Sequence, residues 1–158
     1  MVNFPNERSR TDWLPLPLRL IIGYGFMAHG WAKWSNGPEG FAKLLDQIGA
    51  PLPAATAWAV TLLEFFGGLA VLVGAYVAVV SVPLILTMLV AMFTVHLKHG
   101  FSSIKTIGLT ETGPLFGPPG VEVNLLYIAG LLALILGGAG TLSVDRFRAH
   151  NGRISGAA

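Results

Sequence analysis

One stretch of the chain, residues 54–95, is apolar almost throughout and contains a single charged residue, Glu64. At about forty residues it has twice the ~20 apolar residues that one helix needs to cross the hydrocarbon core of a bilayer. Soluble domains carry roughly 25% charged residues, whereas this chain has 11%. The run therefore predicts two consecutive membrane spans and, with them, an integral membrane protein.

Apolar segments on either side of this run complete a set of four predicted spans. The predicted fold class is all-α, an integral membrane four-helix bundle with a short interfacial helix in the first loop. The spans cover residues 16–34, 56–73, 77–97 and 121–140, within a domain of residues 16–141. An exposed N-terminal tail is expected at residues 1–15 and a polar C-terminal tail at residues 142–158. Because Arg19 interrupts the first apolar segment and no cleavage site follows it, we expect a retained span rather than a signal peptide.

The first and third loops have distinct patterns. In the first, residues 35–53, Asn36 can cap a short helix and Pro38 suits its first position. Apolar residues repeat there at helical spacing opposite charged ones, which is typical of a helix lying along the membrane interface or capping the bundle. The third loop, residues 98–120, is rich in Gly, Pro, Ser and Thr, and we expect a long extramembrane loop of the kind that often carries function.

Four spans place both termini on one side of the membrane. The basic residues on that side are Arg8, Arg10, Arg19, Arg146, Arg148 and Arg153, against Lys33, Lys43, Lys98 and Lys105 on the other. This excess predicts cytoplasmic termini in a bacterial or archaeal inner membrane. The expected partners are the lipid bilayer and other membrane or soluble redox subunits. A net charge of +2 without a basic stripe predicts no binding to nucleic acid.

Ionisable side chains inside the spans are the candidate functional residues, because a charge inside a bilayer is costly. Alternating span directions bring all of them except Arg19 to the half of the bundle that lies away from the termini. The catalytic candidates are Glu64 and His29, and the ligand-binding candidates are Lys33, His96, Glu122 and Arg19.

Glu64 gives the most specific of these predictions. It shares a helix face with Gly67 and Gly68, and small residues let membrane helices approach closely, so its carboxylate should face the bundle interior. A structural alternative remains open, in which Glu64 simply bonds to Lys33 or to a histidine. Arg19 is expected to extend its side chain to the cytoplasmic interface.

Several chemistries are excluded. The chain has no cysteine, and therefore no disulfide, thiolate metal ligand or thiol nucleophile. No span contains the Glu-x-x-His pair of di-iron bundles, and no metal site is predicted. Acid–base or hydrogen-bond chemistry on a lipophilic ligand such as a quinone is left. A bis-histidine haem between His29 and His96 is a less favoured alternative.

The order and spacing of these residues resemble the DoxX family of small bacterial and archaeal membrane proteins. The matching elements are Arg19, His29-Gly30-x-x-Lys33, Glu64-x-x-Gly67-Gly68, His96-x-x-x-Gly100-Phe101, Glu122 and Leu142-Ser143-Val144-Asp145, over roughly residues 16–146. The resemblance implies a four-span membrane protein, often an oxidoreductase, with relatives that include the membrane subunit of a thiosulfate:quinone oxidoreductase. Because cysteine is absent, sulfur chemistry would need a partner or a bound cofactor.

Three functional hypotheses follow. The first is a quinone-linked membrane oxidoreductase, or the membrane subunit of one, in which Glu64 transfers a proton and histidines orient carbonyl oxygens. The second is a non-catalytic scaffold or accessory subunit of a larger membrane complex, favoured by the small size and the glycine-lined helices. The third is a haem-binding bundle.

Overall fold

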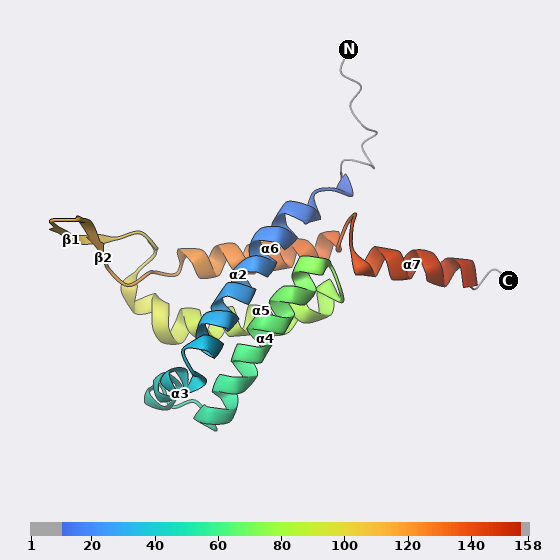
Figure 1. Ribbon diagram of the computed structural model, residues 1–158. Helices are drawn as coiled ribbons and strands as arrows, with labels where there is room; N and C mark the ends of the chain where they lie inside the picture. Colours follow the sequence, from blue (N-terminus) through green and yellow to red (C-terminus); the bar gives the residue numbers. More distant parts are fainter. Residues whose placement is uncertain (1–10, 156–158) are drawn as a thin grey trace, which may run out of the picture.

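The computed structural model describes residues 11–155 and is mostly helical (Figure 1). Residues 1–10 of the predicted N-terminal tail, with Arg8 and Arg10, lie outside this part of the chain, as do residues 156–158. The described part contains six α-helices and one β-hairpin. The helices are α2 (Pro15–Ser35), α3 (Pro38–Gln47), α4 (Pro53–Val73), α5 (Val77–Ala91), α6 (Glu122–Gly137) and α7 (Val144–Ser155).

The four segments predicted to span the membrane are helical over most of their length, although α6 ends at Gly137, before the predicted end at residue 140. Among the described residues, Pro53–Val73 and the continuous helical segment Val77–His99 are long and apolar enough to cross a bilayer. The apolar α6 is shorter, at 16 residues, and α2 has 21 residues. The first loop contains the predicted short helix, α3, although its N-cap is Gly37 at φ 81°. Asn36, expected to cap α3, instead follows the end of α2.

Helices α2 and α4 form a close antiparallel pair whose contact surface consists largely of glycine. A Cβ atom at Gly30 would lie 2.5 Å from the backbone nitrogen of Phe65, and one at Gly23 would lie 2.7 Å from that of Leu72. On α4, a Cβ at Gly68 would lie 2.6 Å from the backbone nitrogen of Met27. Only glycine permits so close an approach, which is a common packing device of membrane helices.

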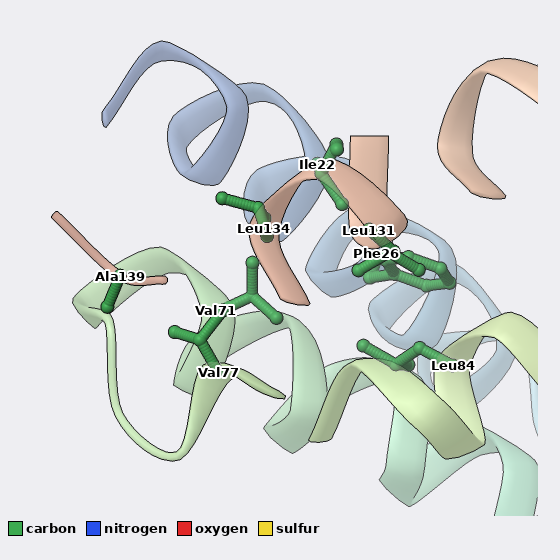
Figure 2. Close-up of a cluster of buried hydrophobic side chains, with 8 residues drawn as sticks. All are labelled: Ile22, Phe26, Val71, Val77, Leu84, Leu131, Leu134 and Ala139. Atoms are coloured by element: carbon green, nitrogen blue, oxygen red, sulfur yellow. The ribbon is translucent and has the colours of Figure 1, made fainter. Parts of the chain in front are cut away.

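The apolar core joins this pair to a second antiparallel pair, α5 and α6 (Figure 2). Phe26 from α2 and Leu84 from α5 are fully buried side by side with Leu131 from α6. Val71 near the end of α4 and Val77 at the start of α5 are buried in the same core. These contacts fix the four long helices around one interior.

The helix that begins as α5 changes its winding before it ends. After Ala91 it continues as a π-helix, η1 (Met92–His96), and then as a 3₁₀ turn, η2 (Leu97–His99). A π-turn holds an extra residue, which changes the direction of the side chains that follow it, and such turns are frequent at functional sites. His96 is the last residue of this π-turn.

The third loop and the C-terminal tail contain structure that was not predicted. Strands β1 (Thr106–Thr110) and β2 (Gly113–Phe116) pair antiparallel within the loop. The tail forms α7, and its Asp145 accepts hydrogen bonds from the backbone nitrogens of Tyr76 (2.7 Å) and Val77 (3.0 Å) at the start of α5. The hairpin and α7 project from opposite ends of the α5–α6 pair (Figure 1).

Candidate functional site

A cavity of about 590 Å³ lies at the end of the bundle away from α7, between α3, α4 and α5 with its π-turn. Most of its wall is apolar. The lining residues are Lys33, Phe41, Leu44, Leu45, Ile48, Ala50, Pro51, Thr56, Val60, Glu64, Leu86, Thr87, Val90, Ala91, Thr94, Val95 and His96. Such a volume with few polar groups is typical of a small-molecule site.

Lys33 and Glu64 form an ion pair at this cavity. The ammonium of Lys33 donates a hydrogen bond to Oε2 of Glu64. The Glu64 side chain is only 4% exposed and that of Lys33 is 25% exposed. Glu64 therefore faces the bundle interior, as its neighbouring glycines predict. Lys33 Nζ also lies 4.9 Å from the ring centroid of Phe41 on α3, so this helix covers the pair from outside.

His96 reaches the same cavity from the π-turn of the α5 segment. Its Nδ1 lies 3.0 Å from the carbonyl oxygen of Pro119, at the end of the third loop. Pro119 does not line the cavity, so the imidazole ring bridges the loop and the cavity wall. Three of the predicted site residues thus meet around one space.

Glu122 holds the third loop rather than lining the cavity. Its Oε2 accepts a hydrogen bond of 2.9 Å from the backbone nitrogen of Ser103. The hydroxyl of Ser103 in turn accepts from the backbone nitrogen of Val123 at 3.2 Å. This reciprocal pattern resembles a capping box and ties the loop to the first turn of α6.

His29 lies on another surface of α2. It is exposed, and its ring contacts that of Tyr127 on α6 edge-on, with 6.4 Å between centroids. It does not line the cavity that Lys33, Glu64 and His96 share. One turn of helix separates His29 from Lys33, but Lys33 pairs with Glu64 while the ring of His29 contacts that of Tyr127.

The expectation that Arg19 extends to the interface is wrong, since Arg19 is 1% exposed. Its guanidinium donates to five backbone carbonyls: Val71 (3.2 Å), Leu72 (3.0 Å), Ala139 (2.8 Å), Thr141 (3.0 Å) and Leu142 (3.0 Å). These oxygens come from the end of α4 and the segment after α6, where helices leave carbonyls without partners. With its donors occupied in this way, Arg19 is a structural residue and has no capacity left for a ligand.

Sequence reasoning missed several polar residues near the site. Thr87 and Thr94 line the cavity, and their apolar surroundings gave no reason to select a threonine. Asn124 is 4% exposed and directs its amide toward Met88 on α5, 3.4 Å from the carbonyl oxygen. A buried amide between two apolar spans is itself a signal, because burial of a polar group is costly without a partner.

Comparison with known proteins gives a consistent result. The chain matches the DoxX family over residues 14–97, which include the ion pair and His96 but not Glu122. A Bacillus subtilis (strain 168) protein named "Putative oxidoreductase CatD" is 37% identical over 86 residues, which are 54% of this chain and 62% of that protein, less than two thirds of its length. An uncharacterised protein of Haemophilus influenzae is 28% identical over 134 residues, or 82% of this chain and 80% of its own length. No solved structure matches the chain.

Proposed function

This chain belongs to the DoxX family of membrane proteins, and from that premise we propose that it crosses the membrane four times with both termini in the cytoplasm. The crossing segments would be α2, α4, the α5 segment through His99, and α6. Their antiparallel pairing supports this topology, as do the arginines beyond α6. The domain would extend over residues 16–141, between the two tails.

The proposed activity is that of a quinone-linked membrane oxidoreductase or of its membrane subunit. The observation that carries this proposal is the cavity, in which an apolar wall surrounds the part-buried Lys33–Glu64 pair and His96. A lipid-soluble ring would bury its apolar surface against α3 and α5, and its polar atoms would meet these three side chains. The name of the Bacillus relative supports the same broad class.

The two residues of the ion pair, Glu64 and Lys33, have distinct proposed roles. A quinone supplies redox chemistry by accepting two electrons and two protons. Glu64 would hold or release a proton at its carboxylate, with Lys33 compensating the charge. Lys33 would also donate its remaining N–H groups to a ligand oxygen. The haem alternative has no support in the geometry, because His29 and His96 do not face a common cavity.

A binding and activity experiment tests this proposal. The protein would be purified in lipid nanodiscs, and binding of a short-chain quinone analogue would be measured for wild type, Glu64→Gln and the matched control Glu39→Gln. Glu39 is an exposed carboxylate on α3 that does not line the cavity. We expect Glu64→Gln to slow quinone-dependent respiration of the host membrane about tenfold or more, as loss of a general acid–base group does, while Glu39→Gln behaves as wild type.

The outcomes separate the hypotheses. If wild type binds no quinone analogue and yields no co-purified quinone, the quinone proposal fails. If a defined complex co-purifies and keeps full activity with Glu64→Gln, the chain is an accessory subunit.

A further inference from the structure

The hydroxyl groups that line the cavity have already used their donors. Thr87 donates to the carbonyl oxygen of Leu84 at 2.8 Å, and Thr94 donates to that of Val90 at 2.7 Å. Thr56 donates to Pro51 at 2.7 Å. Each hydroxyl has one proton and two lone pairs. All three therefore face a ligand as acceptors only.

His96 also offers a ligand only an acceptor, because its contact with the third loop uses its N–H donor. The carbonyl oxygen of Pro119 can only accept, so Nδ1, 3.0 Å away, must carry the proton. In the neutral ring, Nε2 then carries a lone pair and accepts a hydrogen bond. Thr94 belongs to the same π-turn as His96 and also lines the cavity, so this part of the wall presents two acceptors.

Lys33 is the exception among the lining side chains. An ammonium has three N–H donors and no lone pair. Glu64 takes one donor of Lys33, so the others remain available for an oxygen of the ligand. The cavity therefore has one place that donates, beside Glu64, and another that accepts, beside His96.

We infer that the His96 side of the cavity binds a hydroxyl group, so that the site selects a lipophilic phenol, including the reduced hydroquinone form of a ring, over a molecule of the same shape that only accepts. This inference rests on the proposed ligand cavity and specifies its chemistry. A ligand carbonyl beside His96 would place lone pair against lone pair with no proton between them, which costs affinity. A hydroxyl there donates to Nε2 or to Thr94.

A pair of matched ligands tests the inference without requiring redox activity. The probes are para-heptylphenol and its methyl ether, which have nearly the same shape but differ in the one donor. Their binding to wild-type protein in nanodiscs would be measured against empty nanodiscs of the same lipid. We expect the phenol to bind about tenfold more tightly, which corresponds to one hydrogen bond. Val60→Phe, which fills the cavity wall, should weaken both ligands.

A second variant assigns the preference to His96. In His96→Asn, the side-chain amide can still donate to Pro119, but no atom replaces Nε2. We expect the phenol to lose its advantage while the methyl ether binds as before. His96→Gln, which places an amide oxygen near the former Nε2, should restore part of it.

Every outcome is decisive. If wild type binds both ligands equally, or if His96→Asn keeps the full preference, the inference is overturned and the cavity stands. If wild type binds neither ligand above the empty nanodisc, the inference and the proposed cavity function fail together.

Discussion

Arg19 and Lys33 are two basic residues of one helix, α2, and their surroundings differ sharply. Arg19 is surrounded by backbone carbonyls from two segments far along the chain, and all its hydrogen bonds go to them. Lys33 has one carboxylate partner, a neighbouring aromatic ring and an adjoining cavity of about 590 Å³.

The comparison shows that burial of a charge does not by itself identify a functional residue. The cost of burying a cation can be offset by hydrogen bonds to a set of backbone carbonyls, and at Arg19 these bonds connect α2 to the end of α4 and to the segment after α6. Where a cation has fewer hydrogen-bond partners than N–H donors and a cavity lies beside it, as at Lys33, the unused donors can bind a ligand. The number of unused donors and the adjoining volume distinguish the two cases.

The largest expected effect comes from removing the Arg19 guanidinium. Arg19→Met deletes five hydrogen bonds and leaves buried carbonyls without partners, so we expect a loss of about 3 kcal/mol or more in the free energy of unfolding. Thermal unfolding in detergent would measure it. Arg19→Lys keeps the charge with fewer donors and a different shape, so its stability should lie between those of wild type and Arg19→Met. An unchanged melting temperature in Arg19→Met would abolish the distinction between the two cations.

A smaller loss is expected from breaking the ion pair. Lys33→Met leaves Glu64 buried with no counter-charge, at a cost of about 3 kcal/mol, the lower end for buried pairs, because Lys33 is 25% exposed. The double variant Lys33→Met/Glu64→Leu should recover most of this stability and still bind no quinone analogue. Such a recovery would show that the pair serves the cavity rather than the fold. If the double variant is as unstable as Lys33→Met, the pair is structural, like Arg19.

The smallest effect concerns the helix seam that connects the two sites. Gly68→Ala would place a Cβ 2.6 Å from the backbone of Met27, and we expect a loss of about 1–3 kcal/mol from overpacking. The matched control is Gly40→Ala in α3, where nothing lies within 4 Å of the added Cβ. There we expect a gain of about 0.5–1 kcal/mol, because alanine favours the helix. Equal effects of the two substitutions on the melting temperature would contradict close packing of α2 against α4 and open space beside Gly40 on α3.

Local patterns in the sequence predicted the helices and the direction of Glu64. Apolar runs and prolines located the long helices, and Gly67 and Gly68 correctly placed the carboxylate inside the bundle. Lys33 was a correctly named partner of Glu64. Each of these inferences depends on residues within one helix or on two consecutive long helices, α2 and α4.

The remaining features depend on contacts between distant segments. The five carbonyls around Arg19 include oxygens from residues 139–142, and backbone oxygens carry no mark in a sequence. His29 and Lys33 lie one helical turn apart on α2, yet Lys33 pairs with Glu64 and His29 contacts Tyr127. This difference depends on how α2 packs against α4 and α6. The orientation of His96 depends on a π-turn and on Pro119, and neither follows from helical periodicity.

The hydrogen bonds of Arg19 to backbone carbonyls also set the order in which these contacts can form during synthesis. Arg19 emerges with α2, but three of its five acceptors, on Ala139, Thr141 and Leu142, are translated at least 120 residues later. Until the segment after α6 has been made, the guanidinium of Arg19 lacks these three hydrogen-bond acceptors. A chain that stops before residue 139 therefore cannot form three of the five hydrogen bonds of Arg19.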